Sequence, residues 1–160
     1  MNLTVASSPH IRGNFRTNRI MMDVVLALLP ALAVGLWKFG FRVIPVTTIC
    51  VGSAIVSEWL YCLLTKSRNT IVDGSAIVTG LLLAYNLPAT APWWIAVIGS
   101  VIAIVLVKQR FGGIGSNFMN PALTARAILF ISWSGIMGAY PVSAFTPDAL
   151  SAATPRVTLN

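Results

Sequence analysis

The stretch of sequence that decides the fold is VIPVTTICVGSAIVSEWLYCLL at residues 43–64. A helix needs about 20 apolar residues to cross the roughly 30 Å of hydrocarbon in a bilayer, and this run is long enough. It holds one charged residue, Glu58. A run of this length and composition is typical of a transmembrane helix.

The composition of the whole chain supports a membrane protein. Hydrophobic residues make up 56% of the sequence and charged residues only 9%, and the mean hydropathy is +0.81. Such a chain has too few polar side chains to cover a soluble globule, which excludes an independent soluble enzyme domain. Its net charge of +7 lies in short clusters between apolar runs, where membrane proteins carry orientation signals, so we expect a lipid bilayer and no nucleic acid as partner.

Five apolar runs divide the chain. They cover residues 21–37, 43–64, 71–87, 93–107 and a last run from Asn120 to about Ser134. The pattern predicts an all-α integral membrane protein with an N-terminal segment at 1–20, a five-helix transmembrane domain at 21–134 and a C-terminal segment at 135–160. Several runs are shorter than 20 residues, which indicates snorkelling flanks or helices broken inside the bundle.

The loop cations predict the orientation. Counted on alternate sides of the five runs, seven lie on one side (Arg12, Arg16, Arg19, Lys66, Arg68, Lys108, Arg110) and three on the other (Lys38, Arg42, Arg156). By the positive-inside bias, the N-terminus is cytoplasmic. An odd number of spans then places residues 135–160 on the outer face.

The glycine-rich loop after the fourth run is a candidate ligand site. Its glycines lack the spacing of a dinucleotide fingerprint, and no P-loop lysine follows them. They allow close approach of the backbone to a ligand, and the next helix begins with a good capping residue, so its amides favour an anion or a polar ring edge. A turn that only packs is the alternative. The candidate residues are Gly112, Gly113, Gly115, Asn117 and Asn120.

Glu58 is an ionisable group inside the second apolar run, six residues before its inner end. An unpaired carboxylate at this depth costs a few kcal/mol, and such residues mark ion or proton paths. The alternative is a structural salt bridge to a basic residue such as Arg126, which itself lies inside the fifth run, or to a basic residue on a helix beyond this sequence. The sequence leaves both interpretations open.

A face of small residues opens the third run. Ser75, Ala76, Thr79 and Gly80 share one side of a helix, which predicts close contact with a neighbouring helix first and a ligand wall second.

The segment DALSAATP at residues 148–155 contains small residues and ends near a threonine, Thr154. Taken alone, it is either a surface turn or an attachment site. Other segments give it weight: SPHI (8–11), ALLPA (27–31), DGSAIVTGLLL (73–83), NLP (86–88) and FGGIGSNFMNPA (111–122). As a set, they resemble the membrane-subunit family of the Rnf ion-translocating ferredoxin:NAD oxidoreductase D subunit and, less closely, of the sodium-translocating NADH:quinone oxidoreductase B subunit.

The resemblance implies a covalent flavin. The hydroxyl of Thr154 would be esterified by the phosphate of FMN, within a motif that also contains Asp148 and Ser151. Alanines stand at 149 and 152, where the family motif has glycines. A separate flavin transferase would attach the FMN, and a second flavin such as riboflavin could bind in the bundle.

The resemblance also implies a function and a larger architecture. The chain would be the N-terminal half of a ten-helix inverted-repeat bundle, a multi-pass protein of the bacterial inner membrane. It would relay electrons between the other subunits of the complex, coupled to movement of Na⁺ or H⁺, as an electron-carrying subunit rather than a complete enzyme. A scaffold or channel-like subunit without a redox group is the alternative.

Overall fold

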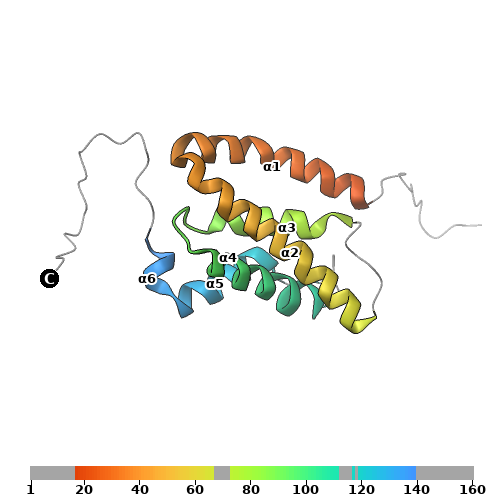
Figure 1. Cartoon of the computed structure of the whole chain (residues 1–160). Helices are drawn as coiled ribbons and strands as arrows, with labels where there is room; N and C mark the ends of the chain where they lie inside the picture. Colours follow the sequence, from red (N-terminus) through yellow and green to blue (C-terminus); the bar gives the residue numbers. More distant parts are fainter. Residues whose placement is uncertain (1–16, 67–72, 112–116, 118, 140–160) are drawn as a thin grey trace, which may run out of the picture.

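The computed structural model describes residues 17–66, 73–111, 117 and 119–139, and every element in these ranges is helical (Figure 1). The prediction of an all-α protein is therefore confirmed for this part of the chain. The elements are α1 (Thr17–Phe39), the 3₁₀ turn η1 (Gly40–Arg42), α2 (Val43–Thr65), α3 (Ser75–Asn86), α4 (Trp93–Val101), the π-helix η3 (Ile102–Gln109), α5 (Pro121–Ser132) and α6 (Ser134–Met137).

The helices α1 and α2 form a hairpin (Figure 1). The chain reverses at η1, where Gly40 has a φ of +69° that side-chain-bearing residues rarely adopt. Together, Thr17–Thr65 is the one helical segment of the described residues that is both long and apolar enough to cross a membrane. Each leg has 23 residues, or about 34 Å of helix at 1.5 Å per residue, which matches the thickness of a bilayer core.

The remaining apolar runs form shorter helices. α3, the continuous helix from α4 into η3, and α5 each fall below the ~20 residues of a full crossing. Two of them show local breaks: η3 departs from α-helical geometry, and Trp133, with φ −136° and ψ 56°, separates α5 from α6. In the third run, the described residues form α3 from Ser75 onward, and the first residues of the run, 71 and 72, lie outside the described ranges. The fourth run extends two residues further than predicted, to Gln109.

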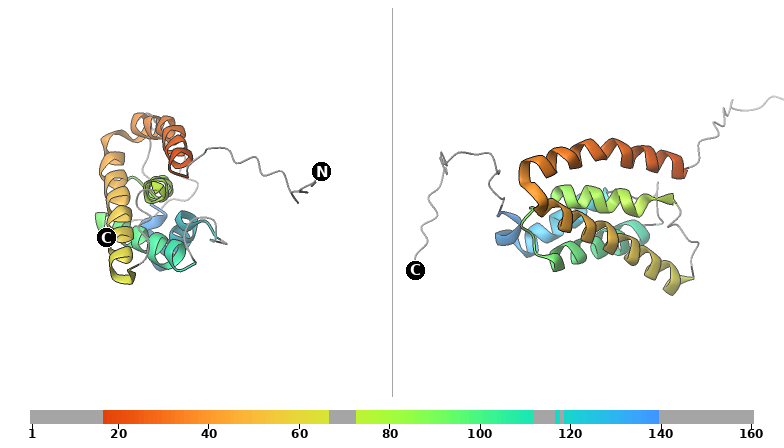
Figure 2. Two further views of the ribbon diagram at one scale, coloured as in Figure 1. Left: turned by 90° about the vertical axis from the view of Figure 1, so that its right-hand side faces the viewer. Right: turned by 45° about the horizontal axis from the view of Figure 1, so that its top comes forward.

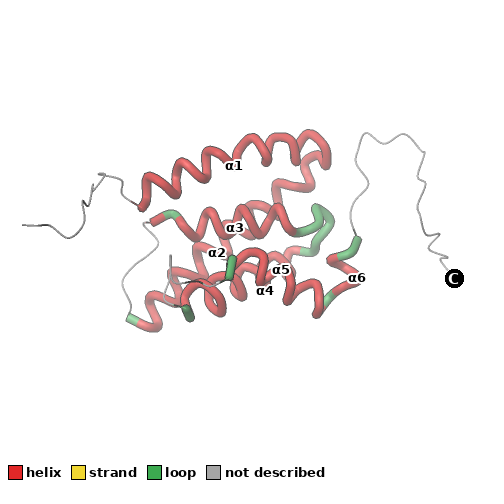
Figure 3. Tube along the Cα trace, turned by 180° about the vertical axis from the view of Figure 1, so that it is seen from behind, coloured by secondary structure: helices red, strands yellow, loops and turns green. Residues whose placement is uncertain are grey.

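Helix α3 occupies the middle of the molecule, surrounded by α1, α2, α4 and α5 (Figure 2). Seen from behind, α1 lies along α3, on the side away from α4 and α5 (Figure 3). The phenolic oxygen of Tyr85 on α3 donates a hydrogen bond to the carbonyl of Leu28 on α1 (2.8 Å). α1 buries none of its residues, so most of its apolar surface is exposed.

The core lies where α2 and α3 meet α4 and α5. Leu83, Ile95 and Leu129 are fully buried there. The hydroxyl of Ser100 on α4 donates to the carbonyl of Cys50 on α2 (3.0 Å), so a polar contact also links these two helices.

The small-residue face of α3 lets its backbone approach that of α2 closely. Ser75, Ala76, Thr79 and Gly80 are all buried. A Cβ atom added at Gly80 would lie 2.8 Å from Cα of Val51 and 3.0 Å from the carbonyl oxygen of Cys50, both backbone atoms of α2. The prediction that this face serves close helix contact is confirmed.

We expect Gly80→Ala to lower the thermal unfolding midpoint of the detergent-purified protein. The added methyl group meets backbone that cannot rotate away, so α2 and α3 must separate, at a cost of about 1–3 kcal/mol. Gly52→Ala is the matched control, because a Cβ at Gly52 in α2 meets no atom within 4 Å. Equal midpoints for the two variants would contradict the close contact.

Candidate functional site

A buried ion pair joins α2 to η3. The ammonium group of Lys108 lies 2.6 Å from Oε1 of Glu58, and the two residues are 2% and 0% exposed. Lys108 also donates to the hydroxyl of Ser75 at the start of α3, and Gln109 donates to the same Glu58 oxygen (3.1 Å). Three helices thus supply the polar groups that stabilise two charges inside an apolar protein.

Lys108 lies near the end of the π-helix η3. In η3, backbone hydrogen bonds run from i to i+5, so its turns are wider than those of an α-helix. The segment reads IAIVLVKQ and follows Gly99 and Ser100, a pair of the kind that often accompanies helix distortions. The Lys108 contacts to Glu58 and Ser75 lie at the end of this π segment.

Asn117 and Asn120 complete this end of the bundle. With its amide nitrogen facing the end of η3, Asn117 donates to the carbonyls of Val107 (3.1 Å) and Lys108 (3.2 Å). The side-chain oxygen of Asn120 accepts from the amide nitrogens of Ala122 (3.0 Å) and Leu123 (3.4 Å), so the predicted cap of α5 is confirmed.

A small cavity lies between these groups. Its volume is about 190 Å³, and Lys108, Ser75, Asn117 and Asn120 are among the residues that line it. Both asparagines of the predicted ligand loop thus lie beside the ion pair. The glycines of that loop, Gly112, Gly113 and Gly115, lie outside the described residues, as do Asp148, Ser151 and Thr154 of the flavin motif.

The ion pair corrects two expectations. The cation beside Glu58 is Lys108, whereas Arg126 on α5 donates to the side-chain oxygen of Asn86 (2.9 Å). Lys108 is also no solvated loop cation, because η3 carries the fourth apolar run two residues further than predicted and turns this side chain inward. Without Lys108, the count is six loop cations on the predicted cytoplasmic side and three on the predicted outer side, so the direction of the charge bias is unchanged.

Comparison with known proteins relates the chain to membrane subunits of redox complexes. A sequence profile of the "NQR2, RnfD, RnfE family" matches residues 4–160. The D subunit of the Na⁺-translocating ferredoxin:NAD⁺ oxidoreductase complex of Acetobacterium woodii is 52% identical over 99% of this chain and 50% of its own length. The D subunit of the proton-translocating ferredoxin:NAD⁺ oxidoreductase complex of Clostridium ljungdahlii is 40% identical over 95% of this chain and 46% of its own. The chain spans about half the length of these curated relatives.

We expect Lys108→Met to destabilise the protein strongly, because it leaves the Glu58 carboxylate buried without its cation. Breaking a buried pair from one side costs about 3–5 kcal/mol, whereas replacing both partners by neutral groups is often close to neutral. The double variant Glu58→Gln with Lys108→Met should therefore recover much of the lost unfolding midpoint.

The control is Arg110→Met, which removes an exposed cation two residues further along. Its unfolding midpoint should stay near that of the wild type. The single variant Glu58→Gln completes the comparison. If the double variant loses as much unfolding free energy as Glu58→Gln and Lys108→Met lose together, the pair is not a coupled unit.

Proposed function

Because the chain belongs to the NQR2, RnfD, RnfE family, we propose that it forms part of a membrane subunit of an ion-translocating oxidoreductase complex. The observation that carries this proposal is the 52% identity to a D subunit over 99% of the chain. The apolar hairpin of α1 and α2 and the exposed apolar surface of α1 agree with it. Its partners are the other subunits of the complex, and its place is the bacterial inner membrane.

The proposed topology has five crossings, with the N-terminus in the cytoplasm, and corresponds to one half of a ten-helix inverted-repeat bundle. The α1–α2 hairpin supplies the first two crossings. The short helices α3, α4 with η3, and α5 follow the pattern of broken helices that bundles tolerate where neighbouring helices cover the backbone. α6 lies at the same end of the molecule as the α1–α2 turn (Figure 1), which is the outer face in this topology.

We place the redox group at Thr154. Its hydroxyl oxygen would form a phosphoester with FMN, attached by a separate flavin transferase. Bound there, the flavin ring would accept and donate one or two electrons while the chain keeps it from diffusing away. The position of α6 at the proposed outer end supports this placement, because α6 ends at Met137, shortly before the flavin motif in the sequence.

A second flavin at the asparagine cavity is not part of the proposal. The cavity measures about 190 Å³, below the roughly 300–1,000 Å³ of pockets that enclose ligands of that size. The side chains of Asn117 and Asn120 also use their hydrogen bonds to cap η3 and α5.

We place Glu58 on the ion path, together with Lys108. An ionisable pair inside an apolar bundle is expensive to maintain, and in membrane proteins such groups are characteristic of ion and proton paths. Its location supports this role, because the pair lies at the cytoplasmic end of the proposed topology, beside a small cavity that Lys108, Asn117 and Asn120 help to line.

The flavin proposal is tested with Thr154→Val, made in the full-length protein together with the transferase. Valine keeps the branched shape but removes the hydroxyl, so the protein should fold and lose its covalent flavin fluorescence in a denaturing gel. Ser151→Ala is the control and should keep the label. A fluorescent Thr154→Val band, or a wild type that never gains the mass of FMN, would favour the scaffold or channel-like subunit.

The ion-path proposal is tested with the double variant Glu58→Gln with Lys108→Met in the assembled complex. We expect it to assemble, since no buried charge is left without a partner, and to lose ion transport coupled to electron transfer. Unchanged coupled transport would show that the pair is structural only.

A further inference from the structure

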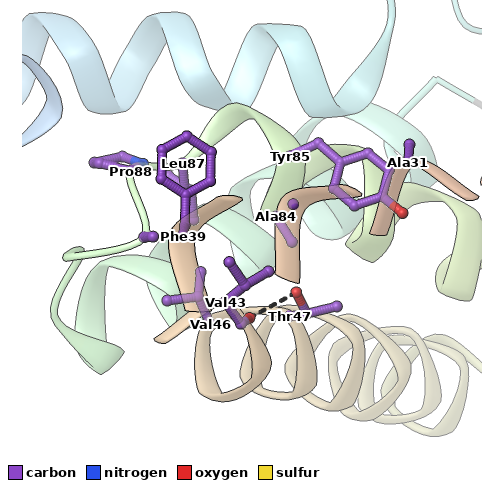
Figure 4. A pocket seen from close by; sticks show the side chains of 11 residues that line it. Ala31, Phe39, Val43, Val46, Thr47, Ala84, Tyr85, Leu87 and Pro88 are labelled. Atoms are coloured by element: carbon purple, nitrogen blue, oxygen red, sulfur yellow. Dashed lines mark hydrogen bonds between the residues drawn. The ribbon is translucent and has the colours of Figure 1, made fainter. Parts of the chain in front are cut away.

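A second cavity lies at the other end of the molecule, between α1, α2 and the end of α3 (Figure 4). Its volume is about 360 Å³, within the range of ligand pockets. In Figure 4, Phe39 and Pro88 lie towards one side of the cavity, and Ala31 and Tyr85 towards the other. The cavity therefore extends from the α1–α2 turn along the face that α1 turns towards α3.

The wall of this cavity suits a hydrocarbon chain. Most of its described lining residues are apolar. The two hydroxyl groups among them already donate to backbone carbonyls, Thr47 to Val43 (2.8 Å) and Tyr85 to Leu28 (2.8 Å). A polar ligand that needs a hydrogen-bond donor would find neither of them available.

The turn beside the cavity carries positive charge. Lys38 and Arg42 are exposed and directly precede the lining residues Phe39 and Val43. The exposed aromatic residues Trp37 and Phe41 lie in the same turn, which is typical of segments at the membrane–water interface. A basic residue near a membrane surface attracts anionic lipid by about 1 kcal/mol.

We propose that the cavity binds one acyl chain of an anionic phospholipid, with the lipid phosphate at Lys38 and Arg42. An apolar cavity with two cations at the adjacent turn complements a molecule that has a hydrocarbon tail and a negative head. The lipid would fill the space between α1 and the rest of the bundle, where α1 contributes no buried residue of its own.

Gly35→Leu tests the cavity. Gly35 lines it, and a Cβ at this position meets no atom within 4 Å, so a leucine can enter the space without strain and also suits a helix better than glycine. In nanodiscs with equal amounts of phosphatidylglycerol and phosphatidylethanolamine, native mass spectrometry should show retained phosphatidylglycerol on the wild type. The Gly35→Leu protein should retain about tenfold less.

The matched control is Gly52→Leu, which also has open space at its Cβ but lies outside the cavity lining. The Gly52→Leu protein should retain as much phosphatidylglycerol as the wild type. The unfolding midpoints of both leucine variants should be equal to or higher than the wild-type midpoint. Equal retention by the two leucine variants would overturn the proposal. So would a wild type that retains no lipid, or one that retains an isoprenoid or a free fatty acid instead.

Lys38→Gln with Arg42→Gln tests the headgroup. The double variant should still retain phospholipid, because the cavity is intact, but its preference for phosphatidylglycerol over phosphatidylethanolamine should fall roughly tenfold. An unchanged preference would overturn the assignment of the phosphate to these two residues.

Discussion

The packing of this bundle depends on the neutralisation of two charges in an apolar interior. Glu58 and Lys108 have left water, and the cost of doing so is recovered only when each charge lies close to its partner and to further hydrogen-bonding groups. Ser75 and Gln109 provide such groups. Because these residues come from α2, α3 and η3, the pair fixes the positions of three helices relative to one another at the end of the bundle where α2 and η3 finish and α3 begins.

At the core, the same helices are held by contact rather than by charge. Gly80 lets the backbones of α2 and α3 approach until no side chain fits between them. In lipid, helices gain little from burying apolar surface against each other, so close backbone packing and interhelical hydrogen bonds gain in importance. The hydrogen bond from Ser100 to the Cys50 carbonyl adds to this contact on the adjoining side of α2.

Much of this arrangement could be predicted from the sequence. The apolar runs gave the helices to within a few residues, because helix formation in a bilayer follows from hydrophobicity and from the need to satisfy every backbone group. The small face of α3 and the Asn120 cap rest on local spacing, and both predictions are confirmed.

The partner of Glu58 could not be predicted in this way. Lys108 follows an apolar run, where a lysine normally marks the membrane surface, but in the structure η3 continues to Gln109 and the Lys108 side chain is buried against Glu58. The sequence offers one weak signal, because Lys108 is followed directly by Gln109, a second polar residue that contacts Glu58. A lysine at this position can either reach water or pair with a carboxylate on another helix, and local spacing does not distinguish the two.

The π-helix also constrains how this sequence can change over evolutionary time. A π turn holds an additional residue compared with an α turn, as if one residue had been inserted into an ordinary helix. Deletion of one apolar residue between Ile102 and Val107 would remove this additional residue and let the segment return to the α form, so the helical turns before and after it would keep their relative orientation. Apolar side chains make up most of η3. In an ordinary α-helix, the same deletion would rotate everything after it by roughly 100°. Alignments of related chains should therefore show single-residue gaps in this stretch as well as substitutions between apolar side chains.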